Sequence, residues 1–312
     1  MAGERPLRLG TRKSDLALTQ SRTVAGMIGG AVELIGMVTE GDRLVDVPLR
    51  GALQKGYFTE ALERALLDGS IDVAVHSLKD LPTAMAPGLV VGAIPVRERV
   101  ADLLFVRAAS WAEGFDASLP LAPGARVGAS SPRRQSLLRT VREDCSAELL
   151  RGNVPTRLRR LGEGAFDAIV LAEAGVRRLV AGGVSLALDG LRVARLAPSV
   201  WTPAPGQGAL AVQCREDDAA TRAQLFALHD EGCAEAVATE RRWLTMLGGG
   251  CSVPFGAWVV GARWAMGFER SGRFDGVSGT GIPAGDAALS LLLAGGAMVP
   301  LPMKWEEIDV RA

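Results

Sequence analysis

Lysine and histidine are scarce in this chain of 312 residues, whereas arginine is abundant. Only four lysines occur, Lys13, Lys55, Lys79 and Lys304, and the formal net charge is zero. A neutral chain offers no overall surface for a polyanion, which argues against a nucleic-acid partner. Positive charge must therefore act locally, and each lysine stands out against the preference for arginine.

Clustered metal ligands and long apolar runs are also missing. The four cysteines are scattered without a C-x-x-C pair, and His76 and His229 are the two histidines, so we expect no metal site. The run from Leu289 to Met298 contains glycines and is too short to span a membrane. No charged-then-apolar leader opens the chain. We therefore expect a cytoplasmic protein with reduced thiols and no membrane segment.

The most informative stretch runs from Ile71 to Pro82. Its first half, as far as Val75, predicts a short strand that is apolar on both faces, as parallel sheets require. Ser77, Lys79 and Asp80 follow at the carboxyl end of this strand, where open α/β sheets place their ligands. A carboxylate beside an ammonium suits proton transfer, and a surface turn with a local ion pair is the alternative interpretation.

Three other strand-to-helix turns carry cations. Ser14 or Thr11 can cap the helix after the first turn, at residues 10–14. Ser131 can cap the helix after the second turn, at residues 126–134. Because a helix N-terminus attracts anions and arginine forks match carboxylates, these turns predict sites for an acidic ligand. An ordinary capped turn is the alternative for the first. The turns span residues 10–14, 126–134 and 151–157.

A short internal echo indicates two similar α/β domains. The segment from Gly164 to Leu171 resembles that from Gly69 to Val75. Crossings between the domains are expected near Arg97 to Arg99 and from Trp201 to Ala211, and the composition changes near Asp217. We therefore predict domain 1 at 1–100 with 201–218, domain 2 at 101–200 and domain 3 at 219–312.

One cysteine follows a run of three glycines. A helix predicted from Cys233 to Leu247 is stopped by these glycines, and Cys251 comes directly after them. A thiol on such a loop suits covalent chemistry, although core packing is the commoner role of cysteine. Lys55, at the end of a long polar loop, is either a substrate contact or an exposed lysine.

Two classes of function fit these features. One is a bilobal binding protein for an organic polyanion, and the other is an enzyme that acts on a multiply carboxylated substrate. A pure binding protein would need neither the thiol of Cys251 nor Asp80 among so many cations. The sequence therefore favours the enzyme.

Taken together, the motifs resemble the porphobilinogen deaminase (hydroxymethylbilane synthase) family. They occur in the order of the family and span residues 7 to about 256. The matching stretches are Gly10 to Ser14, Lys55 to Phe58, Val75 to Pro82, Gly128 to Gln135, Arg151 to Asn153, Pro203 to Ala209 and Gly249 to Pro254.

The resemblance implies a fold and a chemistry. The expected fold is α/β, with two domains like those of type II periplasmic binding proteins around a cleft and a smaller α+β C-terminal domain. The expected activity is that of a transferase. The enzyme would join four porphobilinogen molecules head to tail onto a covalent dipyrromethane cofactor. Ammonia leaves at each addition, and hydrolysis then releases hydroxymethylbilane. A monomer whose partner is the small-molecule substrate is also implied.

The resemblance also implies roles for individual residues. Asp80 would be catalytic, and Cys251 would carry the cofactor through a thioether bond. Six further residues would bind the cofactor, namely Lys79, Ser77, Ser131, Arg133, Arg134 and Arg151. Seven would bind the substrate, namely Arg12, Ser14, Lys55, Phe58, Arg157, Arg178 and Gln207.

Overall fold

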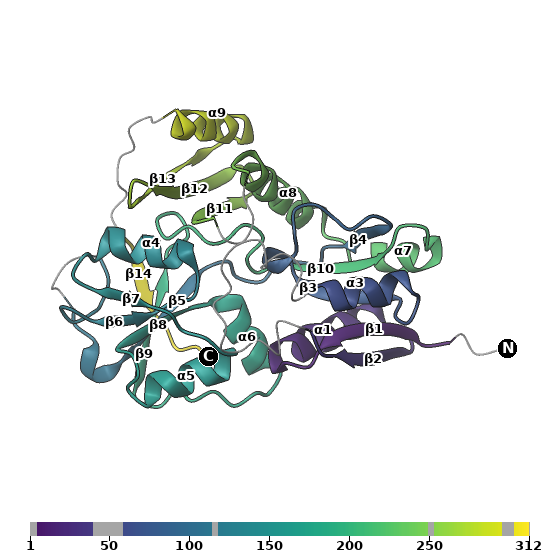
Figure 1. The fold of residues 1–312 in the computed structure, drawn as a ribbon, viewed down its shortest axis with the longest axis horizontal. Coiled ribbons are helices and arrows are strands. Elements are labelled where there is room, and N and C mark those ends of the chain that lie inside the picture. The colour runs from purple at the N-terminus through teal and green to yellow at the C-terminus, as the bar shows by residue number, and fades with distance from the viewer. Residues whose placement is uncertain (1–4, 40–58, 114–117, 249–252, 295–302, 312) are drawn as a thin grey trace. The chain divides into compact units, whose positions relative to one another are not determined.

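The chain groups into two compact units in the computed structural model (Figure 1). The structure describes residues 5–39, 59–113, 118–248, 253–294 and 303–311. Unit 1 comprises Met1–Glu98 with Gly208–Glu235, and unit 2 comprises Arg99–Gln207 with Ala236–Ala312. The chain thus changes unit at residues 98–99, 207–208 and 235–236. The division into three domains stays a prediction.

Unit 1 is built on a five-stranded sheet in the order β2-β1-β3-β10-β4. Strand β1 pairs in parallel with β2 and β3, whereas β10 pairs antiparallel with β3 and β4. The described elements are β1 (Leu7–Arg12), α1 (Asp15–Ile28), β2 (Val32–Met37), α3 (Glu60–Leu67), β3 (Val73–Ser77), the 3-10 turn η2 (Leu78–Asp80), β4 (Leu89–Ala93), β10 (Leu210–Arg215) and α7 (Ala219–Phe226).

Unit 2 repeats this arrangement in a six-stranded sheet, in the order β14-β9-β5-β8-β6-β7. Strand β6 is parallel to β7 and β8, whereas β5 is antiparallel to β8 and β9. The elements are β5 (Asp102–Arg107), the 3-10 turn η3 (Ala108–Ser110), β6 (Arg126–Gly128), α4 (Pro132–Val141), β7 (Ser146–Glu148), α5 (Val154–Gly162), β8 (Ala168–Ala172), α6 (Glu173–Ala181), β9 (Leu191–Leu196) and β14 (Trp305–Glu307).

In both sheets one antiparallel strand therefore lies between the third and fourth strands of a parallel set, and in unit 2 the edge strand β14 is a second antiparallel strand, paired with β9. The inserted strand is β10 in unit 1 and β5 in unit 2, and each lies next to a point where the chain changes unit. The predicted α/β fold class is confirmed. Both strands are buried along almost their whole length, as β5 shows with Leu103 to Val106 fully covered.

The C-terminal part of the chain forms a separate three-stranded antiparallel sheet. Trp243 of α8 and Leu289 of α9 pack against Phe255 and Trp264 of this sheet in one apolar core. The elements are α8 (Glu231–Met246), β11 (Phe255–Val260), β12 (Arg263–Arg270), β13 (Arg273–Thr280) and α9 (Ile282–Leu293). The change of unit at 235–236 falls inside α8.

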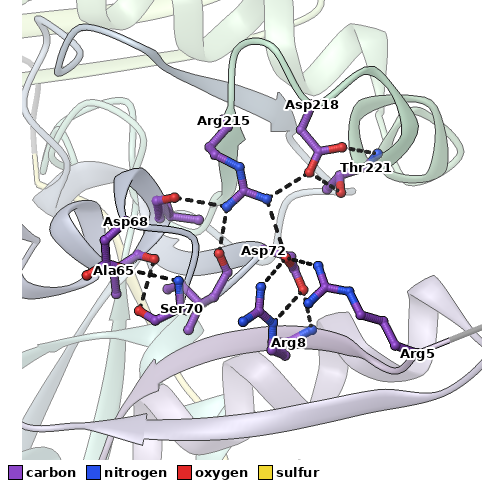
Figure 2. A network of polar contacts seen from close by, with 11 residues as sticks. Arg5, Arg8, Ala65, Asp68, Ser70, Asp72, Arg215, Asp218 and Thr221 are labelled. Atoms are coloured by element: carbon purple, nitrogen blue, oxygen red, sulfur yellow. Dashed lines mark hydrogen bonds and ion pairs between the residues drawn. The ribbon is translucent and has the colours of Figure 1, made fainter.

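A buried carboxylate ties the strands of unit 1 together at the start of β3 (Figure 2). Asp72 is 2% exposed and accepts from the backbone N–H of Arg8 at 3.0 Å and from the Arg8 side chain at 2.8 and 3.1 Å. Arg5 and Arg215 donate to the same carboxylate at 2.9 and 3.3 Å. Burial would raise the pKa of Asp72, but hydrogen bonds from Arg8 hold it well below its usual range.

Asp167 takes the same position in unit 2. It accepts from the backbone N–H of Arg126, the first residue of β6, at 2.9 Å. Its own N–H donates to the Arg126 carbonyl, just as the N–H of Asp72 donates to the carbonyl of Arg8. The echo in the sequence thus marks corresponding points of the two sheets. At each point an aspartate that precedes one strand, β3 or β8, accepts a hydrogen bond from the backbone of the neighbouring strand, β1 or β6.

His76 is a buried titratable group in β3. It is 7% exposed, and its Nε2 lies 2.9 Å from Gln213 Oε1 of the neighbouring β10. Because Gln213 Nε2 donates to Glu63 Oε1 at 3.3 Å, Gln213 Oε1 is the acceptor for His76 Nε2. Burial lowers the pKa of His76 from 6.5 to about 4, and the charge of Arg12 acts in the same direction. His76 is therefore neutral in the folded chain near pH 7.

We predict that this histidine makes the fold sensitive to acid. Between pH 6.5 and 4 the unfolded chain binds a proton at His76 that the folded chain does not, so stability falls as the pH falls. The loss attributable to His76 is about 3 kcal/mol by pH 4. Urea unfolding of the wild type and His76→Gln at several pH values measures it. The prediction is wrong if both proteins lose stability equally over this range.

Candidate active site

In unit 1, predicted site residues lie at the carboxyl end of β1. Arg12 is the last residue of this strand and is half-buried. Ser14 is the N-cap of α1, and its side chain accepts from the N–H of Ala17 at 3.4 Å. The cap thus satisfies a backbone donor in the first turn, and the helix begins directly beside Arg12.

The next strand of this sheet brings Ser77, Lys79 and Asp80 to the same edge, because β3 is parallel to β1. The strand ends at Ser77, whose Oγ accepts from Gln20 Nε2 of α1 at 2.8 Å. Leu78 is buried in the short 3-10 turn that follows. Lys79 is half-buried beside it, and Asp80 is exposed. One buried leucine thus anchors the turn that carries both charged residues.

In unit 2, side-chain hydrogen bonds join the turn after β6 to the turn after β7 and to the first turn of α4. Ser130 Oγ donates to the carbonyl of Leu150, and Gln135 Nε2 donates to the carbonyl of Ala129 at 2.8 Å. Ser131 is the N-cap residue of α4, but its side chain makes no capping hydrogen bond; Pro132 is the first residue of the helix, as predicted. Ser131 is half-buried at the start of this helix.

The turn that carries Arg151 depends on a glycine. Gly152 has a φ of 107°, and a Cβ at this position would lie 2.9 Å from the Cγ2 of Thr156. Asn153 caps α5 by accepting from the N–H of Thr156 at 2.9 Å. Arg157 Nε donates to the Gly152 carbonyl at 2.7 Å. Both predicted arginines are half-buried on one tight turn.

Arg133 and Arg134 are buried, at 2% and 7% exposed, around a carboxylate that the sequence did not single out. Asp102, the first residue of β5, accepts from Arg133 Nη2 at 2.9 Å and from Arg134 Nε and Nη2 at 3.1 and 2.6 Å. Trp201 Nε1 donates to it at 3.0 Å. The available signal was an acidic residue at the head of the apolar run Leu103 to Val106.

Gln207 belongs to the same buried cluster. It is 1% exposed, and its Nε2 donates to Asp102 Oδ1 at 2.8 Å and to the carbonyl of Val100 at 2.7 Å. Gln207 therefore joins the segment at which unit 2 begins to the segment at which the chain leaves it. Its predicted contact with substrate stays a prediction.

The remaining predicted site residues are not brought together by these contacts. Arg178 lies in the last turn of α6, away from the helix start. Lys55, Phe58 and Cys251 lie outside the described residues. In the described ranges, no group of three or more His, Cys, Asp or Glu side chains is arranged to hold a metal ion. No helix in those ranges has both the length and the apolar character to cross a membrane.

Fold and site together define an α/β protein of two units, each with arginine-bearing turns at the carboxyl ends of its parallel strands. The family model described as "Porphobilinogen deaminase, dipyromethane cofactor binding domain" matches residues 7–223. The chain belongs to the porphobilinogen deaminase family.

Individual relatives agree with this family. The porphobilinogen deaminase of Paenibacillus macerans is 41% identical over 265 residues, which cover 82% of this chain and 78% of the relative. That of Syntrophotalea carbinolica is 44% identical over 267 residues, which cover 83% and 80%. Among solved structures, the VFT2 domain of Bordetella pertussis BvgS is 16% identical with a TM-score of 0.41, over 76% of this chain and 91% of that domain.

We predict that Gly152→Ala destabilises the turn that carries Arg151. A side chain at this φ is strained and would meet Thr156, so the free energy of unfolding should fall by about 1–3 kcal/mol. Gly162→Ala is the matched control, because Gly162 lies in α5 with nothing within 4 Å of an added Cβ. The control should be neutral or stabilising. Equal losses for both variants in urea unfolding would contradict this account of the turn.

Proposed function

We propose that this chain catalyses the porphobilinogen deaminase reaction. Four porphobilinogen molecules are joined stepwise, head to tail, onto a covalently held dipyrromethane, and each addition releases ammonia. Hydrolysis then frees hydroxymethylbilane. The observation that carries the proposal is the match of the cofactor-binding domain over residues 7–223, which include the arginine-bearing turns of both units. That match also disfavours a bilobal binding protein for an organic polyanion.

The arginine-bearing turns suit the charge of this substrate. Each porphobilinogen carries an acetate and a propionate, so every addition brings two more carboxylates. Arg12 lies beside the start of α1, and Arg151 and Arg157 flank the start of α5. Guanidinium groups near free helix N–H groups bind carboxylates well. We therefore assign these residues to the carboxylates of the substrate and of the growing chain.

Unit 2 also suits an acidic cofactor, as the cluster around Asp102 indicates. Two guanidinium charges face one carboxylate there, so one positive charge is not balanced within the cluster. Arg133 Nε is buried and has no acceptor among the described residues. When bound, the dipyrromethane supplies the pyrrole carbon to which the first substrate is joined. Arg133, Arg134, Ser131 and Lys79 would hold its carboxylates, and Cys251 would be its point of attachment.

Asp80 is the proposed catalytic group. It is exposed at the end of η2, and Lys79 precedes it in the same turn. Loss of ammonia from porphobilinogen requires a proton on the leaving amine and leaves positive charge on the pyrrole. The Asp80 carboxylate would stabilise that charge and guide the proton. Ser77, half-buried at the end of β3, would contact the cofactor. The proposed contacts with the substrate also include Gln207, Lys55, Phe58 and Arg178.

A cytoplasmic location, a monomeric state and the absence of a nucleic-acid partner are also proposed. The absence of a nucleic-acid partner rests on the neutral net charge, and the cytoplasmic location rests on the scattered cysteines, which suit a reducing compartment. The monomeric state is what the family resemblance implies. Size-exclusion chromatography with light scattering would test the monomeric state directly.

The attachment of the cofactor is tested by intact mass under denaturing conditions. The wild type should exceed its polypeptide mass by two linked pyrrole units, and Cys251→Ala should not. Cys214→Ala is the control, because Cys214 is fully buried and burial raises its thiol pKa to about 11, which makes it a poor nucleophile. A wild type that shows the bare mass before and after incubation with porphobilinogen would refute the assignment.

Asp80→Asn should lower kcat by at least about 100-fold, because the amide neither carries a proton nor balances charge. The mass of the bound cofactor should be unchanged. Asp68→Asn is the control, since Asp68 is exposed and precedes β3 at its opposite end. Turnover by fully loaded Asp80→Asn within a few-fold of the wild type would remove Asp80 from the mechanism.

A further inference from the structure

Asp102 is the most highly coordinated carboxylate in the described part of unit 2. Its side chain is completely buried and accepts five hydrogen bonds from four residues. Arg134 makes a bidentate contact, while Arg133 makes a single contact through Nη2. Bidentate pairs fix the plane of a guanidinium as well as its position. The carboxylate thus determines how both arginines are oriented.

Backbone carbonyls complete the hold on the two guanidinium groups. Arg133 Nη1 donates to Thr202 O at 2.5 Å, and Arg134 Nη1 donates to Val170 O at 3.2 Å. Each guanidinium has five N–H groups. In the described ranges, two of these on Arg133 and three on Arg134 have protein acceptors. Both side chains therefore keep donors for a further anion while their orientation is already set.

The two positive charges could not remain side by side without Asp102. Burial lowers the pKa of Arg133, and the adjacent charge of Arg134 acts in the same direction. Burial also disfavours the charged form of Asp102, yet the two arginines hold its pKa well below the usual range. Loss of the carboxylate would leave two like charges buried together, which a protein relieves by moving or solvating the side chains.

We propose that Asp102 is a positioning residue for cofactor assembly. It orients Arg133 and Arg134 so that their remaining N–H groups receive the carboxylates of the cofactor as it forms. Asp102 itself is fully buried and acts only through the arginines. The inference rests on the proposed function, and it adds a residue that none of the family's motifs in this chain contains.

A purely structural role is the alternative, and the chain offers a matched comparison. Asp72 is also buried, at 2% exposed, and accepts from Arg5, Arg8 and Arg215 in unit 1 (Figure 2). It lies before β3, at the opposite end of that strand from Lys79 and Asp80. Removal of either carboxylate should destabilise the fold, but only Asp102 should affect the cofactor.

The experiment compares Asp102→Asn, Asp102→Glu and Asp72→Asn with the wild type. Each protein is purified, its urea midpoint is measured, and the fraction carrying the dipyrromethane mass is determined. The rate at which cofactor-free protein gains this mass with porphobilinogen is then followed. Asp102→Asn should gain it about 10- to 100-fold more slowly than the wild type. Asp102→Glu, which keeps the charge but shifts it, should be intermediate, and Asp72→Asn should match the wild type.

The outcomes separate the inference from the proposed function. A wild type that never gains the mass refutes the proposed function and with it this inference. If the wild type gains the mass and a folded Asp102→Asn gains it within twofold of the wild-type rate, the inference alone is overturned. Equal slowing in Asp72→Asn also overturns it, because the effect would then follow from stability. If Asp102→Asn does not fold, Asp102→Glu decides, and a wild-type rate for that variant overturns the proposal.

Discussion

Buried aspartates that each hold more than one arginine fix the frame of both units. Asp72 joins the starts of β1 and β3 to the end of β10, and Asp102 joins β5 to the first turn of α4. Arginine suits this role because its planar fork stays charged and meets a carboxylate in a defined geometry. The excess of arginine over lysine in the composition thus has a structural cause.

Local features of the fold were predictable from the sequence because each depends on neighbouring residues. The buried strand that ends at Ser77, the cap at Ser14 and the proline at the start of α4 are all set within a few positions. The predicted strand began two residues early, at Ile71 instead of Val73. Ile71 is instead buried against α3, in a core that includes Leu62.

The long-range partners were not predictable in the same way. Asp102 contacts residues 31, 32, 99 and 105 positions away, so no sequence window contains the cluster. The arginines of the Ser131 turn were predicted to face an acidic ligand, and what the structure shows is their contact with an acidic residue of the protein, Asp102. A charge at the head of an apolar strand marks such a residue but does not identify its partner.

The contrast between the two aspartates shows how one chemistry serves different purposes. Both carboxylates are buried and both are outnumbered by their arginines. At Asp72 the partners are 20–67% exposed, so water screens the excess positive charge. At Asp102 the partners are 3% and 8% exposed, so the excess is retained in a medium that screens it poorly. A buried, unbalanced charge is costly to maintain, and an anionic ligand that neutralises it recovers that cost as binding free energy.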